Sequence, residues 1–375
     1  MAPTKRSSRS RSVLDVLIGL AVLAASGVST PAQGDVPDAS SLAPTSTATA
    51  LASSQYEPRR LAVDAANVYW TAGGKLLAVA KAGGAAREVT APVAAGAIAT
   101  DGAFVFWNDQ TKGTIMKAPV AGGPAIVVAK EQHQPSSVAV DGANVYWANA
   151  KLGGDGFAEV ARAPKAGGAV ALITADQNEP FFVRVDDAKV YWLADEGAGD
   201  LWSAPKTATW VRQERGKPKP PSPAATLLKR RVIDYVADSS GLVWIEKNGV
   251  MTLARGTSTP ATIAAVQNGQ YVAADRTRVF VTTRDAVVMI PRAGGAVTTI
   301  ASGLDQPAEI VSDGTAVYWI TKGKRTDADG IDEGSPARED CPDAGAPGGP
   351  RPVCVTRGSR GGWAHRRGTI SRLVP

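Results

Sequence analysis

The stretch DGANVYWA, residues 141–148, recurs along the chain with small changes. Copies stand at residues 64–71 (DAANVYWT), 186–193 (DDAKVYWL) and 313–320 (DGTAVYWI). An acidic residue begins seven such units, at intervals of 37 to 52 residues: Asp64, Asp101, Asp141, Asp186, Asp238, Asp275 and Asp313. Six of the 9 tryptophans lie six residues after one of these acids: Trp70, Trp107, Trp147, Trp192, Trp244 and Trp319. A recurrence of this kind indicates a repeat architecture.

Each unit contains four short segments with the composition of β-strands. In the third unit, residues 138–140 are apolar, residues 141–144 form a polar turn, and a Val-Tyr-Trp run rich in strand-forming residues follows. Two further segments follow, joined by a Gly-Gly turn. Adjacent side chains of a strand point to opposite faces, so Val145 and Trp147 should fill one interface and Tyr146 the other. Four strands in about 40 residues predict a propeller blade, with the tryptophans in its core.

The seventh unit supplies three strands instead of four. After residue 320 the sequence has a long insertion and then the segment GTISRLVP at 368–375. The missing strand is expected near the other end, because LASSQYEP at 51–58 matches IASGLDQP at 300–307, which precedes another unit. We therefore predict an all-β, seven-bladed propeller of four-stranded blades over residues 47–375. An N-terminal strand within residues 47–57 should complete the last blade and close the ring.

The pattern resembles the bacterial β-propeller repeat proteins of the YWTD and NHL types. The Val-Tyr-Trp strand, the Asp turn before it and the Gly-Gly hairpins carry this resemblance, which covers residues 47–375. It implies a propeller fold and an exported protein. The units depart from the YWTD tetrad at its fourth position, which is occupied by Thr71, Ala148, Leu193 or Ile320. Seven units also differ from the six blades usual for YWTD domains.

The first residues have the pattern of an export signal. Basic residues precede an apolar stretch at 16–25, which is shorter than the roughly 20 residues of a membrane span. We predict a signal peptide at 1–34, a flexible linker at 35–46, and export to the periplasm or the extracellular space. No transmembrane span should remain after cleavage, and an uncleaved membrane anchor is the alternative. In an oxidising compartment, Cys341 and Cys354 are expected to form a disulfide.

Two insertions interrupt the repeat. The first, residues 207–228 of blade 4, lies in a basic stretch: residues 206–231 hold eight Lys or Arg and one acid. It should either contact an anionic surface or remain a solvated arm. The second, residues 322–368 of blade 7, carries in its first part the acidic run TDADGIDEG, whose oxygen ligands suit calcium. The candidate ligands are Asp327, Asp329 and Asp332. Calcium is the one cofactor that the sequence suggests, and an acidic surface loop is the alternative.

Polar loops follow the Val-Tyr-Trp strands and should share one face of the ring. Their Asn, Asp and Gly residues favour a polar ligand or a protein partner. The candidate binding residues are Asn108, Asp109, Asn149, Asp155, Asp195 and, in a connection between blades, His133.

These observations favour a binding or scaffold propeller that recognises a protein or a polar envelope ligand, such as an anionic polymer. An enzyme with its active site at the mouth of the channel, a lyase or a hydrolase, is the alternative. No catalytic residue is predicted, because the chain has 2 histidines and lacks a nucleophile motif or cofactor fingerprint. Although the net charge is +6, basic and aromatic residues are not interleaved as in nucleic-acid-binding proteins.

Overall fold

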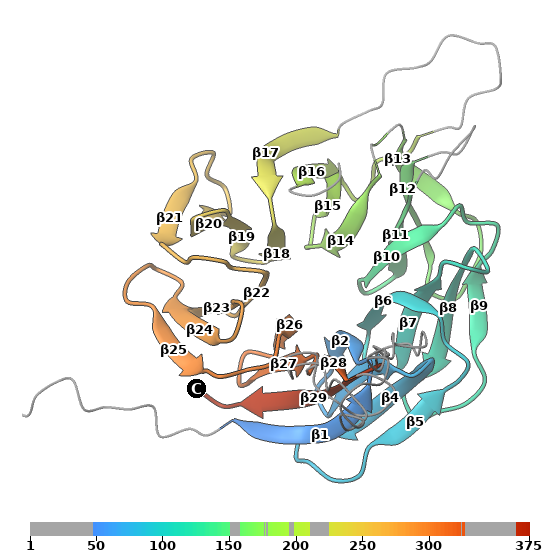
Figure 1. The fold of residues 1–375 in the computed structure, drawn as a ribbon. Coiled ribbons are helices and arrows are strands. Elements are labelled where there is room, and N and C mark those ends of the chain that lie inside the picture. Colours follow the sequence, from blue (N-terminus) through green and yellow to red (C-terminus); the bar gives the residue numbers. More distant parts are fainter. Residues whose placement is uncertain are drawn as a thin grey trace, which may run out of the picture. The chain divides into compact units, whose positions relative to one another are not determined.

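The computed structural model describes residues 48–150, 158–175, 177, 179–194, 199–210, 225–323, 325–326 and 365–375. Within these residues every regular element is a strand, and the strands form seven antiparallel sheets arranged as a ring (Figure 1). The predicted all-β propeller with seven blades of four strands is therefore confirmed.

Each blade runs from an inner strand at the channel to an outer strand at the rim (Figure 1). Blade 1 contains β2 (Arg59–Val63), β3 (Asn67–Ala72), β4 (Lys75–Ala80) and β5 (Arg87–Thr90). Blade 2 contains β6 (Ala95–Thr100), β7 (Phe104–Asp109), β8 (Thr114–Pro119) and β9 (Ile126–Ala129). Blade 3 contains β10 (Pro135–Val140), β11 (Asn144–Asn149), β12 (Glu159–Pro164) and β13 (Ala171–Ala175). Blade 4 contains β14 (Phe181–Val185), β15 (Lys189–Ala194), β16 (Gly199–Pro205) and β17 (Thr226–Val232). Blade 5 contains β18 (Asp234–Asp238), β19 (Gly241–Glu246), β20 (Gly249–Ala254) and β21 (Ala261–Ala264). Blade 6 contains β22 (Tyr271–Ala274), β23 (Arg278–Thr282), β24 (Val287–Pro291) and β25 (Thr298–Ala301).

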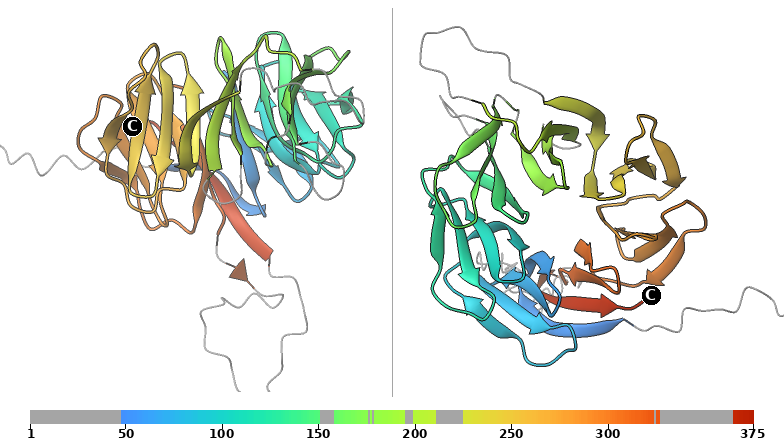
Figure 2. Two further views of the ribbon diagram at one scale, coloured as in Figure 1. Left: turned by 90° about the horizontal axis from the view of Figure 1, so that it is seen from above. Right: turned by 180° about the vertical axis from the view of Figure 1, so that it is seen from behind.

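Blade 7 combines strands from both ends of the described chain. Its order is β26 (Pro307–Ser312), β27 (Val317–Thr321), β29 (His365–Leu373) and β1 (Thr49–Tyr56), with the short β28 (Arg325–Thr326) paired to β29. The outer strand β1 runs antiparallel to β29, so the predicted closure by an N-terminal strand is consistent with the sheet. Figures 1 and 2 show β1 and β29 side by side at the rim.

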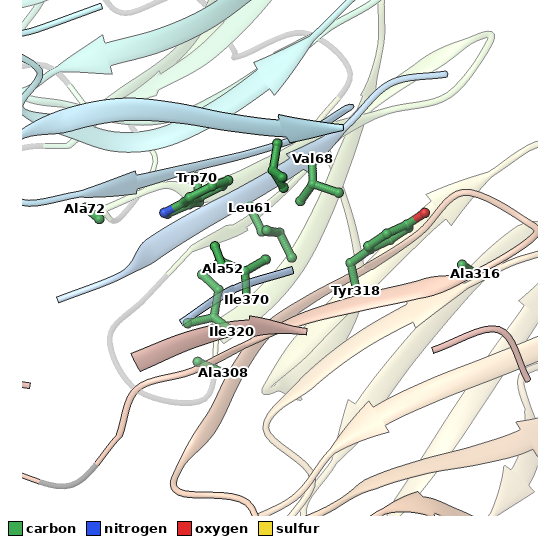
Figure 3. Packing of buried hydrophobic residues seen from close by; sticks show 11 residues of the cluster. Ala52, Leu61, Val68, Trp70, Ala72, Ala308, Ala316, Tyr318, Ile320 and Ile370 are labelled. Carbon is green, nitrogen blue, oxygen red and sulfur yellow. The ribbon is translucent and has the colours of Figure 1, made fainter. Parts of the chain in front are cut away.

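The closing strand is held by a hydrophobic cluster that spans blades 7 and 1. Ala52 of β1 is buried together with Ile370 of β29, Ile320 of β27, and Leu61 and Trp70 of blade 1 (Figure 3). Burial of such side chains contributes about 25 cal/mol for each Å² of apolar surface removed from water. The seam of the ring is therefore packed like the other blade interfaces.

The Tyr-Trp pair divides between the two faces of its blade, as the strand geometry predicts. Val145 and Trp147 pack with Phe106 of blade 2, whereas Tyr146 packs with Val190 and Trp192 of blade 4. All six tryptophans of the repeat position are almost completely buried. They are core residues, which is what the alternating strand pattern indicates.

The acidic residue of the repeat holds the turn and, in the four blades that carry a tyrosine five residues later, also that tyrosine. In blade 3, Asp141 Oδ1 accepts hydrogen bonds from the backbone N–H groups of Ala143 (2.9 Å) and Asn144 (2.8 Å). Its Oδ2 accepts a hydrogen bond from the hydroxyl of Tyr146 at 2.7 Å. Asp64, Asp186 and Asp313 make the same three contacts in their own blades. One carboxylate therefore fixes a turn and orients a core side chain.

A basic side chain from the next blade also reaches this carboxylate in several junctions. Lys206 Nζ of blade 4 lies 2.5 Å from Asp141 Oδ2 of blade 3. Equivalent ion pairs between adjacent blades are Lys81–Asp313, Lys165–Asp101 and Arg292–Asp238, and Arg255 reaches Asp187 beside Asp186. The acidic turns therefore join neighbouring blades as well as strands.

Several sequence predictions lie outside the described residues. These are the signal peptide and linker (1–46), the cysteines Cys341 and Cys354, and most of both insertions. The final residues of each predicted insertion do belong to strands, because β17 begins at Thr226 and β29 at His365.

Candidate functional site

One residue of each blade, four positions before the acidic turn, lines the central channel. These residues are Arg60, Ala97, Ser137, Phe182, Asp234, Tyr271 and Glu309. All seven belong to the inner strands, and they surround a cavity of about 340 Å³. The channel wall therefore differs from blade to blade although the frame repeats.

Two of these side chains bond the backbone of the next inner strand. Ser137 Oγ accepts a hydrogen bond from the N–H of Val183 at 2.7 Å, and Asp234 Oδ2 accepts one from the N–H of Val272 at 2.8 Å. Both side chains are buried. Neighbouring inner strands do not form a common sheet, so such contacts satisfy backbone groups that the sheets leave unpaired.

Asp234 is an unusual acid in the channel wall. Burial raises the pKa of Asp234 to about 6, although the positive charge of Arg184 and the N–H groups of Val272 and Tyr235 oppose this shift. The negative charge of Glu309 raises it further. A carboxyl group with this pKa can exchange a proton near neutral pH, which is a property that acid–base chemistry requires.

A larger pocket of about 600 Å³ opens at one mouth of the channel. It lies where the connection from β1 to β2 meets the connection from β25 to β26 and the residues that follow β27. The residues that line it are Glu57, Pro58, Arg59, Arg60, Tyr271, Gln306, Glu309, Lys322 and Arg366. We call this the mouth pocket. Among the described residues that line it, four basic and two acidic side chains leave an excess of positive charge.

Two of the basic side chains in the mouth pocket have acidic partners. Arg59 lies 3.2 Å from Glu57, and Arg60 lies 3.9 Å from Glu309. The guanidinium of Arg366 donates a hydrogen bond to Oε1 of Gln306, which is uncharged.

Lys322 has a different environment. Among the described residues no carboxylate forms an ion pair with its amino group. Burial lowers the pKa of Lys322, and the positive charges of Arg366, Arg59 and Arg60 lower it further.

The predicted binding residues that the structure describes lie elsewhere. Asn108 and Asn149 are buried at the ends of their strands. Asn108 accepts a hydrogen bond from the N–H of Ala97 at 2.7 Å, and Asn149 donates to Glu159 Oε1 at 2.9 Å. His133 is exposed in the connection between β9 and β10. None of these three lines the mouth pocket, and a role in binding stays a prediction for each.

Asp109 lines a separate pocket of about 480 Å³ between blades 1 and 2, together with Trp107 and Met116. Its carboxylate accepts a hydrogen bond from the N–H of Lys112 at 3.0 Å and forms an ion pair with the amino group of the same residue. Its role in binding also stays a prediction. Asp155, Asp195 and the calcium candidates Asp327, Asp329 and Asp332 lie outside the described residues.

The residues of the mouth pocket were not predicted from the sequence. A signal was present for Arg60, Tyr271 and Glu309, because each stands four residues before an acidic turn. Lys322 and Arg366 carry no such signal, because they flank an insertion and meet through the pairing of β27 with β29 across it.

Two observations on the described residues bear on sites of other kinds. No group of three or more His, Cys, Asp or Glu side chains is placed to hold a metal ion. No helix of the length and apolar character that a membrane span requires is present in this part of the chain.

Comparisons with known proteins support the fold alone. No protein-family model matches the chain, and no curated protein matches its sequence. A puromycin hydrolase is similar in structure, with a TM-score of 0.54 and 11% identity over 73% of this chain and 51% of that chain. The computationally designed Ika8 protein has a TM-score of 0.51 and 14% identity over 74% of this chain and 84% of that chain. A chain of a nidogen/laminin complex has a TM-score of 0.45 and 16% identity, over 60% and 90% of the two chains.

Proposed function

We propose that the protein is a binding propeller that recognises a polar ligand or a protein segment at the mouth pocket. The supporting observation is a cavity of about 600 Å³, polar and rich in charge, at the mouth of the channel. Small-molecule sites are concave, of this size, and built from a few convergent polar groups. In the mouth pocket these groups come from five separate segments, including both sides of the closing seam.

We further propose that the protein acts outside the cytoplasm, where a protein or an anionic polymer of the cell envelope is the partner. The basic and apolar pattern of residues 1–34 supports export. Mass spectrometry of the mature protein from its native host tests this proposal. A mature chain that retains residues 1–34 in the cytoplasm would contradict it.

Binding at the mouth pocket is tested by blocking it. Arg59→Trp adds a bulky ring at the edge of the mouth pocket, where the Arg59 side chain is 69% exposed. Arg230→Trp is the matched control, because the Arg230 side chain is 72% exposed and lies on the outer strand β17. Ligands found by a thermal-shift screen of sugars, amino acids, carboxylates and phosphate esters should lose affinity in Arg59→Trp alone. Equal affinity in both variants would contradict the proposed location.

An enzyme is the second candidate, and the environment of Asp234 favours it. A buried carboxyl group with a pKa of about 6 shares the channel with Tyr271 and Arg184. Asp234→Asn keeps an oxygen that can accept the hydrogen bond from Val272 but removes the titrating proton. Any hydrolase or lyase activity that depends on this site should fall at least about 100-fold in Asp234→Asn, since general acid–base catalysis contributes 10²–10⁴-fold. An unchanged rate in a folded variant would exclude Asp234 as the acid or base.

A further inference from the structure

Among the described residues of the mouth pocket, positive charges outnumber negative ones. Arg59 and Arg60 are each close to one carboxylate, Glu57 and Glu309. Lys322 and Arg366 remain without an acidic partner among the described residues. Both are placed by strand ends, since Lys322 directly follows β27 and Arg366 lies at the start of β29. The two excess positive charges are therefore fixed on the frame of blade 7.

Keeping two like charges in one pocket is unfavourable. The amino group of Lys322 is half-buried, and its lowered pKa reflects both this burial and the repulsion from Arg366, Arg59 and Arg60. An anion bound between Lys322 and Arg366 would offset the repulsion between their positive charges and would take the place of the water that burial removes from them. The gain is larger than at an open surface, because a partly enclosed site screens charge less.

The donors also suit a particular kind of anion. The guanidinium of Arg366 presents several N–H groups in one plane, a geometry that matches the oxygen atoms of a carboxylate or a phosphate. Lys322 adds a point charge with three donors. The amide of Gln306 accepts a hydrogen bond from Arg366, and this contact orients the guanidinium.

We infer that the mouth pocket binds the oxyanion group of a small ligand, a carboxylate or a phosphate, between Lys322 and Arg366. This inference rests on the proposed binding function and gives the chemical class of its ligand. The rest of the ligand faces Tyr271 and Glu309, which line the same pocket and lead to the channel. A hydroxyl or amino group beside the oxyanion would find acceptors there.

The test uses the full chain and simple anions. Binding of inorganic phosphate and of acetate is measured by isothermal titration calorimetry, with glycerol as an uncharged probe. Lys322→Gln and Arg366→Gln should each weaken the binding of the preferred anion at least tenfold. Lys130→Gln, which removes the same charge from an exposed position between β9 and β10, should bind as the wild type does. The stronger of the two anions distinguishes a phosphate ligand from a carboxylate ligand.

A second measurement is made on the wild-type protein and uses a variant only to assign a resonance. Lysine amino groups of the wild-type protein are labelled by reductive ¹³C-methylation, and the Lys322 resonance is assigned from its loss in Lys322→Gln. The bound anion should raise the pKa of Lys322 toward its usual value, because a negative charge favours the protonated amine. A pKa of Lys322 that is unchanged by saturating phosphate and by saturating acetate would overturn the inference.

Other outcomes separate this inference from the proposed function. Glycerol or sugar binding that is blocked by Arg59→Trp but unaffected by Lys322→Gln would retain the mouth pocket and refute an oxyanion ligand. Anion binding that appears only after Asp327, Asp329 and Asp332 are replaced by Asn would also overturn the inference of an external ligand. Equal loss of phosphate binding in Lys322→Gln and Lys130→Gln would indicate general charge attraction instead of a site.

Discussion

The tryptophans of the repeat provide a sharp test of the packing. In three blades the indole Nε1 donates a hydrogen bond to a glutamine 15 residues earlier: Trp70 to Gln55 (3.1 Å), Trp147 to Gln132 (2.8 Å) and Trp192 to Gln177 (3.0 Å). Fifteen residues before Trp319 the sequence has Leu304. Among the described residues the buried Nε1 of Trp319 has no acceptor. We predict that Leu304→Gln stabilises the protein.

The backbone of Leu304 lies at the same point of its connection between blades as the backbones of Gln132 and Gln177 do in theirs. Its N–H donates to the carbonyl of Asp285 at 2.8 Å, just as the N–H of Gln132 donates to Gly113 at 2.9 Å. A glutamine at position 304 should therefore reach the indole without moving the chain.

The expected gain follows from two opposing effects. A buried donor without a partner costs about 1–3 kcal/mol. Leu304 is only half-buried, so replacing it loses about 1 kcal/mol of apolar burial. The net effect should be an increase of about 1 kcal/mol in the free energy of unfolding, measured by urea denaturation.

A double-mutant cycle isolates the cause. Trp319→Phe removes the N–H, so Leu304→Gln should lose its benefit in that background. Gln132→Leu is the reverse change in blade 3, and it should destabilise the protein by about 1–3 kcal/mol by leaving Trp147 Nε1 unpaired. The reasoning fails if Leu304→Gln is equally stabilising with Phe at position 319, or if hydrogen exchange of the Trp319 indole is unchanged.

Three further predictions concern the junctions, the seam and the acidic insertion. Burial by itself raises the pKa of Asp313, but the hydrogen bonds that it accepts, first from Lys81, outweigh this effect and lower the pKa to about 2. Because the folded pKa of Asp313 lies below the unfolded value, the contribution of its carboxylate to the free energy of unfolding is complete above about pH 4 and declines as the pH falls toward 2. Lys81→Met should therefore lower the free energy of unfolding by about 1 kcal/mol at pH 7 after solvent screening. A difference between this variant and the wild type that does not change with pH would contradict the prediction. Ala52→Asp should destabilise by at least about 2 kcal/mol by burying a carboxylate in the seam, whereas Ala50→Asp at an exposed position of β1 should have little effect on the urea midpoint. If the acidic insertion binds calcium, the ion should raise the melting temperature and Asp329→Ala should abolish this rise; identical melting curves with calcium and with a chelator would refute the site.

The fold was predictable because its determinants repeat. The acidic turn, the Tyr-Trp strand and the LASSQYEP match place the blades and the closing strand, and each is a local pattern that recurs at a measurable spacing. The second role of Asp141, as partner of Lys206 in the next blade, was not predicted, because a local repeat pattern carries no information on contacts between blades. It follows from geometry once the blades are adjacent.

The candidate site was less predictable for a physical reason. Asn108 and Asn149 stand at strand ends followed by polar loops, which suggested exposure, yet the strands remain buried to their last residues. A polar residue at that point can face either solvent or the neighbouring blade, and composition does not distinguish the two. The mouth pocket, conversely, depends on Lys322 and Arg366, which are brought together by the pairing of β27 with β29 across a long insertion instead of by a motif.

The composition of blade 7 has a consequence for the order of events in folding. Thr49 of β1 pairs with Arg372 of β29, about 320 residues later in the chain. At a synthesis rate of roughly 5–20 residues per second, β1 emerges from the ribosome roughly 15–65 s before its partner. During that time its backbone N–H and C=O groups form an unpaired edge, which is a template for association with other chains. We expect that β1 is kept from associating with other chains until β29 is made, either by a bound chaperone or because the segment stays unfolded.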